Sequence, residues 1–197
     1  MPGPRTANRY PPELIARLEI EPPLKIGVVG DTHGSSASDV STIEMVANLF
    51  GRFNVGLILH TGDIGRPFVL QALEECAPVA AVRGNADSLE LSEGLPDRID
   101  IRSSKHLIVL LHGHLGKTAR AVANSAAGPG VDIVVFGHSH RPLIEREGMT
   151  ILFNPGSPTQ RRWHPHFGVG LLSVTDDAIK PELVLFEDVR HLDNVVP

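Results

Sequence analysis

Five short apolar runs in this sequence each end in a polar segment that contains glycine together with His, Asp or Asn. The runs are rich in Val, Ile and Leu, as buried strands are, and the segments that end them read GDTHG, HTGDIG, RGNAD, HGHLG and GHSH. In α/β folds the carboxyl ends of parallel strands lie at one edge of the sheet, where ligands bind. The pattern therefore predicts that side chains far apart in the sequence meet at one site.

The spacing of apolar residues predicts an α/β fold. Helical patterns occupy residues 39–53, 66–76 and 116–130 and alternate with strands, whereas the last third of the chain is mostly strand. Parallel βαβ units followed by antiparallel hairpins fit this order, as one mixed sheet or as two packed sheets flanked by helices. The expected strands cover residues 25–29, 55–59, 79–82, 99–102, 107–111, 133–136, 142–146, 150–153, 168–174 and 182–186.

The composition predicts one globular domain preceded by a short arm. The chain has 197 residues, of which 42% are hydrophobic and 21% charged, and these are values of ordinary single domains. Residues 1–22 are broken by prolines, so we expect an arm that is poorly ordered or wraps over the surface, with a short helix over residues 13–18. The domain then covers residues 23–197.

Charge and cysteine content favour a cytoplasmic protein that is not a general nucleic-acid binder. The lone Cys76 cannot form an intramolecular disulfide, which favours a reducing compartment. A formal net charge of −5 disfavours nucleic acid as a general partner. No apolar run has the length of a membrane-spanning helix, so we expect no membrane partner.

The polar segments suit a centre of two metal ions. Carboxylates and imidazoles are ligands for divalent metals, and such a centre leaves positions open for water and substrate. Each segment alone has another interpretation: an N-cap turn at residues 31–33, tight turns at residues 60–63 and 84–87, and solvated loops at the two histidine pairs. If these alternatives were right, five unrelated turns or loops would all have to fall at matching strand ends. A metal centre explains all five segments together and is therefore favoured.

The ordered series GDTHG, TGDIG, GNAD, LHGH and GHSH resembles the calcineurin-like metallophosphoesterases. The compact length and the stretch FNPGSP (residues 153–158) resemble their small bacterial and archaeal phosphodiesterase branch. The resemblance covers residues 24 to about 187. It implies a four-layer α/β-β/α sandwich of two mixed sheets flanked by helices. It also implies a dinuclear metal-dependent phosphoesterase, in first place a phosphodiesterase, that hydrolyses small phosphate esters by attack of a metal-bridging hydroxide on phosphorus.

The resemblance assigns seven metal ligands. One ion would be held by Asp31, His33 and His140, the other by Asn85, His112 and His138, and Asp63 would bridge the two. The expected cofactors are two divalent metal ions, with Mn²⁺ first and Fe, Zn²⁺, Ni²⁺ or Co²⁺ as alternatives, because affinity order alone does not choose among them.

The sequence departs from the family pattern at Ala86, where the fuller signature has a histidine that assists the leaving group. Alanine transfers no proton, so we expect better activity on esters with acidic leaving groups. His114 is the candidate substitute acid, with simple packing beside the site as the alternative. Asn85 is a second catalytic candidate, through contact with a phosphate oxygen. His60 is expected to orient its neighbours by hydrogen bonding rather than to bind metal.

Two adjacent arginines follow the FNPGSP stretch. Arg161 and Arg162 are candidates to bind a substrate phosphate through bidentate hydrogen bonds, and a solvated pair is the alternative. The neighbouring Trp163, His164 and His166 are expected to line a pocket wall or to cover an oligomer contact.

Two other functions compete with the small-molecule enzyme. The retromer complex contains a subunit of this fold that serves mainly in protein assembly, but loss of ligands would be expected of a scaffold, and all seven positions are intact here. A nuclease of the same chemistry would need a groove for a polyanion, and the chain has no dense run of Lys and Arg. The resemblance alone suggests a homodimer.

Overall fold

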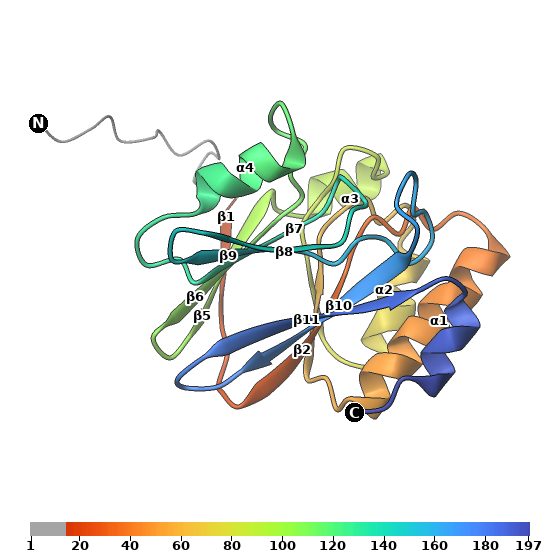
Figure 1. Cartoon of the computed structure of the whole chain (residues 1–197). Coiled ribbons are helices and arrows are strands. Elements are labelled where there is room, and N and C mark those ends of the chain that lie inside the picture. Colours follow the sequence, from red (N-terminus) through yellow and green to blue (C-terminus); the bar gives the residue numbers. More distant parts are fainter. Residues whose placement is uncertain (1–14) are drawn as a thin grey trace, which may run out of the picture.

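The computed structural model describes residues 15–197, and its strands form two sheets (Figure 1). The six-stranded sheet has the order β1 (Ile15–Glu19), β5 (Arg98–Ser103), β6 (His106–Leu111), β7 (Ile133–Phe136), β9 (Thr150–Asn154) and β8 (Leu143–Glu147). The five-stranded sheet has the order β11 (Ile179–Phe186), β10 (Phe167–Val174), β2 (Leu24–Val29), β3 (Leu57–His60) and β4 (Val79–Ala81).

The two sheets pack face to face, and helices cover their outer faces. An apolar cluster joins Ile26, Val28 and Leu59 of the five-stranded sheet to Ile108 and Val135 of the six-stranded sheet. Figure 1 shows α4 (Ala119–Ala126) outside the six-stranded sheet, and α1 (Ala37–Arg52) and α2 (Phe68–Glu74) outside the five-stranded one. The predicted four-layer α/β-β/α sandwich with two mixed sheets is confirmed.

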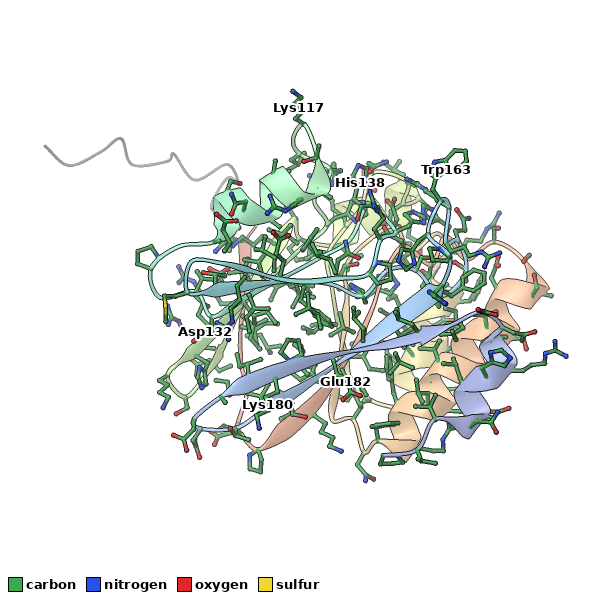
Figure 2. The ribbon with its side chains drawn as sticks, in the orientation of Figure 1. Lys117, Asp132, His138, Trp163, Lys180 and Glu182 are labelled. Carbon is green, nitrogen blue, oxygen red and sulfur yellow. The ribbon has the colours of Figure 1, made fainter. Side chains whose placement is uncertain are left out.

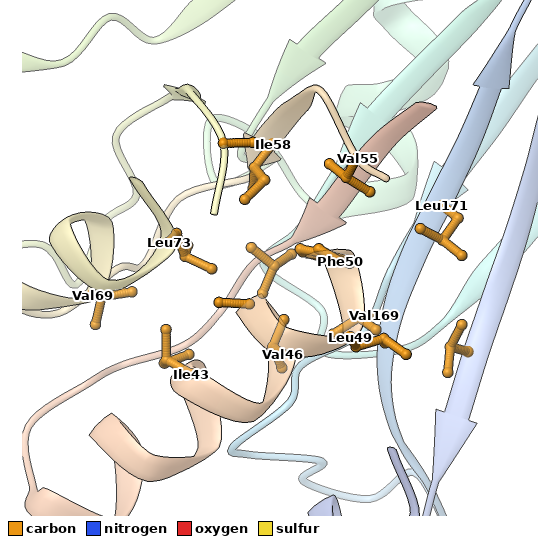
Figure 3. Packing of buried hydrophobic residues seen from close by; sticks show 14 of the residues in the cluster. Ile43, Val46, Leu49, Phe50, Val55, Ile58, Val69, Leu73, Val169 and Leu171 are labelled. Carbon is orange, nitrogen blue, oxygen red and sulfur yellow. The ribbon is translucent and has the colours of Figure 1, made fainter. Parts of the chain in front are cut away.

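Helix α1 shows how sequence fixes one of these layers. Ser36 accepts a hydrogen bond from the backbone of Asp39, and the Asp39 carboxylate accepts from the backbone of Ser36, so a capping box begins the helix. Phe50 is fully buried on the inner face of α1 and lies against Gly27 of β2, where an added Cβ would come within 2.8 Å of its ring. Figure 3 shows this face of α1 packed against α2 and β10. Glycine in β2 therefore lets α1 approach the sheet closely.

Apart from the short helix expected over residues 13–18, the predicted elements are present with small shifts at their ends, and two short elements within the domain were missed. The helices over 39–53, 66–76 and 116–130 correspond to α1, α2 and α4, and all ten predicted strands are found. Strand β3 begins at Leu57 rather than at residue 55. The missed elements are the six-residue helix α3 (Leu89–Gly94) and the 3-10 helix η2 (Val189–Asn194).

The helix expected over residues 13–18 is wrong within the described part of the chain. Residues 15–18 belong to β1, which pairs in parallel with β5, so that Leu18 lies opposite Ile101. Ala16, Leu18 and Ile20 alternate along β1 and pack against the cluster between the sheets, the two-residue period of a strand. The predicted arm therefore contributes a sheet strand from residue 15 onward, and residues 13 and 14 lie outside the described residues.

No helix within residues 15–197 combines the length and the apolar character needed to cross a membrane.

Strands β2, β3 and β4 run parallel in one sheet, and β6 and β7 run parallel in the other. The five polar segments all follow the carboxyl ends of these strands.

Candidate metal centre

Six of the predicted ligands form two clusters at the carboxyl ends of the parallel strands. In each cluster one ligand atom per residue lies within 4.8 Å of those of the other two, and the clusters are Asp31 with His33 and His140, and Asp63 with His112 and His138. Each cluster combines a loop of the five-stranded sheet with a loop of the six-stranded sheet. The ends of both sheets therefore converge on one place, as the strand-end pattern predicts.

The backbone of these loops is strained where the ligands lie. A positive φ costs a residue other than glycine about 1–2 kcal/mol, and such residues persist where the surrounding structure holds them for a function. Of the eight non-glycine residues with positive φ in the described chain, five are predicted ligands: Asp31 (51°), His33 (44°), Asp63 (52°), His138 (68°) and His140 (55°).

A glycine allows the loops of β3 and β4 to touch. A Cβ added at Gly84 would lie 2.1 Å from Oδ1 of Asp63, far inside contact distance. The residue after next, Ala86, donates its backbone N–H to the same Oδ1 at 2.8 Å. The sequence GNAD therefore fits against Asp63 because its first residue has no side chain.

Two histidines are held in one tautomer by backbone carbonyls. Nδ1 of His112 lies 2.8 Å from the carbonyl oxygen of Thr61, and Nδ1 of His140 lies 2.5 Å from that of Gln160. A carbonyl only accepts, so each Nδ1 carries the proton and each Nε2 presents a lone pair. This is how metal-binding histidines are commonly oriented in proteins.

Asp63 lies between the two clusters. Its Oδ2 is 3.6 Å from Nε2 of His33, which belongs to the first cluster, and 3.3 Å from Nε2 of His112, which belongs to its own. Burial acts to raise the pKa of Asp63, but the close approach of His112 and the hydrogen bond from the backbone of Ala86 outweigh it and hold this pKa below its ordinary range. Asp63 is therefore ionised and reaches toward both clusters.

The clusters contain buried atoms that lack hydrogen-bond partners, and a cation would satisfy them. Asp31 is fully buried, and its Oδ1 accepts from the backbone N–H of His138 at 3.0 Å. Among the described residues, Oδ2 of Asp31, Nε2 of His112 and Nδ1 of His138 find no hydrogen-bond partner. Burial raises the pKa of Asp31 to about 7. Buried acceptors of this kind are costly unless they are paired or bind metal, so the donor set fits two divalent cations.

His60 uses both ring nitrogens for hydrogen bonds away from the clusters. Nδ1 accepts the backbone N–H of Gly62 at 3.2 Å, and Nε2 lies 3.0 Å from the hydroxyl of Thr32. That hydroxyl donates to the carbonyl of Ile64 at 3.0 Å, so it accepts from His60. This is the arrangement expected of a residue that orients the ligand loops rather than one that binds metal.

Asp87 braces two of the ligand loops against each other. Its Oδ1 accepts from the backbone N–H groups of Ile64 (2.6 Å) and Gly65 (3.1 Å), and its Oδ2 accepts from that of Gly84 (2.6 Å). In the sequence Asp87 stands out only as a residue that caps a turn. Its wider role depends on the meeting of the β3 and β4 loops, which no local pattern reveals.

Three polar residues at the end of β9 and in the loop after it brace the centre from the other side, and the sequence reasoning missed them. Ser157 donates to the carbonyl of Asp31 at 2.7 Å, and Thr159 donates to that of Thr32 at 2.7 Å. The amide of Asn154 donates to the carbonyl of Gly137 at 3.0 Å. The stretch FNPGSP marks the family in the sequence, and its polar residues follow an apolar strand, which was the available signal.

The other predicted site residues lie near the centre in different ways. Asn85 is exposed in the loop whose neighbours contact Asp63, and within the described residues its side chain makes no hydrogen bond. His114 is half-buried, its ring centroid lies 5.3 Å from that of His112, and its Nδ1 is buried without a partner in the described chain. Burial, followed by the charge of His112, lowers the pKa of His114.

The two arginines differ in their surroundings. Arg161 donates to the carbonyl of Pro165 at 2.6 Å, and its guanidinium lies 5.3 Å from the centroid of the Phe167 ring. Arg161 is thus engaged within its own loop, and its part in substrate binding stays a prediction. Arg162 lies close enough to three predicted ligand histidines to affect their pKa. Burial lowers the pKa of His33, His138 and His140, and the positive charge of Arg162 lowers it further.

Comparison with known proteins gives the family of this site. Residues 24–177 match the model of the calcineurin-like phosphoesterase superfamily domain. A probable metallophosphoesterase of Methanocaldococcus jannaschii is 33% identical over 168 residues, which cover 83% of this chain and 82% of that protein. The phosphodiesterase YfcE of Escherichia coli is 30% identical over 154 residues, which cover 68% of this chain and 79% of that protein.

Solved structures show the same fold. A novel archaeal phosphodiesterase superposes with a TM-score of 0.66 at 23% identity, covering 83% of this chain and all of that one. Vps29 of Entamoeba histolytica in complex with zinc superposes with a TM-score of 0.62 at 23% identity, covering 82% of this chain and 99% of that one.

Proposed function

Because this chain belongs to the calcineurin-like phosphoesterase superfamily, we propose that its two clusters hold two divalent metal ions at which a small phosphodiester is hydrolysed. The protein is a metal-dependent phosphoesterase, a hydrolase acting on ester bonds. The observation that carries the dinuclear assignment is the place of Asp63, with Oδ2 within 3.6 Å of a histidine of each cluster. Bound ions would supply Lewis acidity and an activated water.

In this proposal the ligands divide as the two clusters do. Asp31, His33 and His140 would hold one ion, His112 and His138 would hold the other, and Asp63 would be shared. Asn85 completes the second site from the neighbouring loop, and its amide also contacts a phosphate oxygen. Mn²⁺ is the first candidate metal for this mixture of carboxylate and imidazole donors, with Fe, Zn²⁺, Ni²⁺ and Co²⁺ as alternatives.

Charge explains how an acidic protein binds a phosphate ester. Asp31 and Asp63 bring two negative charges to the centre, and two divalent ions would leave it at about +2 with neutral histidines. Arg162 adds a positive charge on the side of His33, His138 and His140. We assign Arg162 to a non-bridging phosphate oxygen, since guanidinium groups suit phosphate geometry.

His114 is the proposed proton donor to the leaving group. Its ring lies beside that of His112, and its Nδ1 has no partner in the described chain. Ala86 occupies the position where the family's fuller motif has a histidine, and an alanine side chain donates no proton. General acid catalysis contributes roughly 10²–10⁴-fold, so this substitution makes the reaction depend strongly on the leaving group.

The test is a comparison of leaving groups on the Mn²⁺-loaded protein. We expect turnover of bis(p-nitrophenyl) phosphate, and turnover at least about tenfold slower for a diester with an alkyl leaving group. His114→Ala should lower the alkyl rate more than the nitrophenyl rate, because nitrophenolate leaves without protonation. Equal rates for the two esters would contradict the role of Ala86, and an unchanged alkyl rate in His114→Ala would remove His114 from the mechanism.

A diester rather than a monoester is proposed because the relative YfcE is a phosphodiesterase. The Vps29 structures support a scaffold only weakly, since they share the fold at about one quarter identity or less. All six ionisable ligand positions are intact in two compact clusters, which favours catalysis. A nuclease, a homodimer and a cytoplasmic location stay predictions.

A further inference from the structure

A fully exposed tryptophan, Trp163, lies in the loop whose backbone hydrogen-bonds to His140, one of the predicted ligands. We propose that the indole of Trp163 stacks on an aromatic ring of the substrate, so that the preferred substrates are phosphodiesters that carry a nucleobase. This inference rests on the proposed phosphodiesterase function and names the substrate class of the same site. Trp163 is fully solvent-exposed, whereas most large apolar side chains of the described chain are buried.

The loop of Trp163 is anchored directly to the metal centre. The carbonyl of Gln160 lies 2.5 Å from Nδ1 of His140, and Thr159 and Ser157 donate to the carbonyls of Thr32 and Asp31. Trp163 follows Gln160 by three residues, so its Cα lies within about 11 Å of that of Gln160. Figure 2 shows Trp163 and His138 along the same edge of the molecule. The proposed contact requires the indole to reach a group attached to a phosphate at the centre.

A tight turn presents Arg162 and Trp163 together. The backbone N–H of His164 donates to the carbonyl of Arg161 at 2.9 Å, which makes Arg162 and Trp163 the two central residues of the turn. Arg162 has a φ of 49°, a conformation in which glycine is usual. Arg161 holds the base of the turn through Pro165 and Phe167. The turn therefore puts a cationic and an aromatic residue at adjacent positions of the loop that braces the centre.

This pair matches the two parts of a nucleotide. A guanidinium binds a phosphate, and an exposed aromatic side chain stacks on a nucleobase with little dependence on which base it is. The formal charge of −5 and the absence of a dense basic run disfavour a long polyanion. A single nucleotide unit is thus the occupant that the chemistry of this rim favours.

Fluorescence tests the contact without turnover, because Trp163 is the single tryptophan of the sequence. Adenosine 5′-monophosphate is titrated into the Zn²⁺-loaded protein, with ribose 5-phosphate as the matched ligand that lacks the base. We expect saturable quenching by the nucleotide and none by the sugar phosphate. Equal responses to both ligands, or none to either, would overturn the stacking contact.

Kinetics test the same contact in the reaction. The substrates are thymidine 5′-(p-nitrophenyl) phosphate and methyl p-nitrophenyl phosphate, which share a leaving group. Trp163→Ala should lower the ratio of their kcat/KM values by about tenfold, and Trp163→Phe should retain most of it. Met149→Ala, at an exposed residue in the turn between β8 and β9, is the matched control and should leave the ratio unchanged.

The outcomes separate this inference from the proposed function. An unchanged ratio in Trp163→Ala overturns the inference while the phosphodiesterase stands. A change in oligomeric state of Trp163→Ala without a change in the ratio would show that the indole covers a protein contact, which also overturns it. Absence of turnover of both esters by the metal-loaded protein would refute the proposed function, and the fluorescence titration would then decide the stacking contact by itself.

Discussion

Asp63→Asn is expected to lower the turnover of bis(p-nitrophenyl) phosphate by about a thousandfold or more. The substitution keeps the shape of the side chain and leaves an acceptor for the N–H of Ala86, but it removes the charge that lies between His33 and His112. Loss of about 4 kcal/mol of transition-state stabilisation corresponds to this decrease, and electrostatic contributions of this size are usual at such centres. Steady-state rates at saturating Mn²⁺ measure it.

The matched control for Asp63→Asn is Asp176→Asn, which makes the same change at an exposed residue after β10. This control should turn over the substrate at the wild-type rate. Circular dichroism of the metal-free proteins should show that both variants are folded. An Asp63→Asn protein that keeps more than about a tenth of the wild-type rate would mean that the shared carboxylate does not take part in catalysis.

Removal of metal is expected to lower the melting temperature by about 10 °C or more. An ion at a hundred times its Kd stabilises a folded protein by about 2.7 kcal/mol per site. Two sites then contribute about 5 kcal/mol, and each kcal/mol moves the melting temperature of a chain of this size by about 2–4 °C. The physical source is the set of buried acceptors in the described chain that lack partners, with Oδ2 of Asp31 among them. Differential scanning calorimetry with Mn²⁺ and with a chelator measures the difference.

The variant Asp31→Asn tests the same metal sites through the melting temperature of the metal-free protein, which we expect not to fall. Burial raises the pKa of Asp31 to about 7, so the ionised carboxylate is unfavourable in the metal-free fold. We expect metal-free Asp31→Asn to melt at or above the temperature of the metal-free parent, and to gain less from Mn²⁺. A chelator that moves the melting temperature of the parent protein by less than about 2 °C would contradict metal binding at both clusters.

The meeting of the polar segments was predictable from the sequence because each segment interrupts an apolar strand at its end, whereas the assignment of metal ligands within them came from the family resemblance. Residues such as Asp31 and His138 have no packing reason to follow a buried strand, so their pattern is local and readable. The sandwich followed from the order of helices and strands together with the family resemblance. The first prediction depends only on the sequence close to each polar segment, and the second depends on the order of elements along the chain.

What could not be predicted depends on contacts between distant segments. Ile15 and Leu18 are three residues apart and fit a helix as well as a strand, and only the edge of β5, some eighty residues later, selects the strand. The bracing by Asp87 and Ser157 likewise requires knowledge of which loops meet. Arg161 and Arg162 are identical in type, and a turn gives them different surroundings.

The central claim is that loops of both sheets hold two ions which share the carboxylate of Asp63. The most direct measurement is anomalous diffraction from crystals of the Mn²⁺-loaded protein. We predict two anomalous peaks about 3.5–4 Å apart, one beside Asp31, His33 and His140 and the other beside His112 and His138, with Asp63 in contact with both. A single peak, or two peaks with Asp63 bound to only one of them, would contradict the claim.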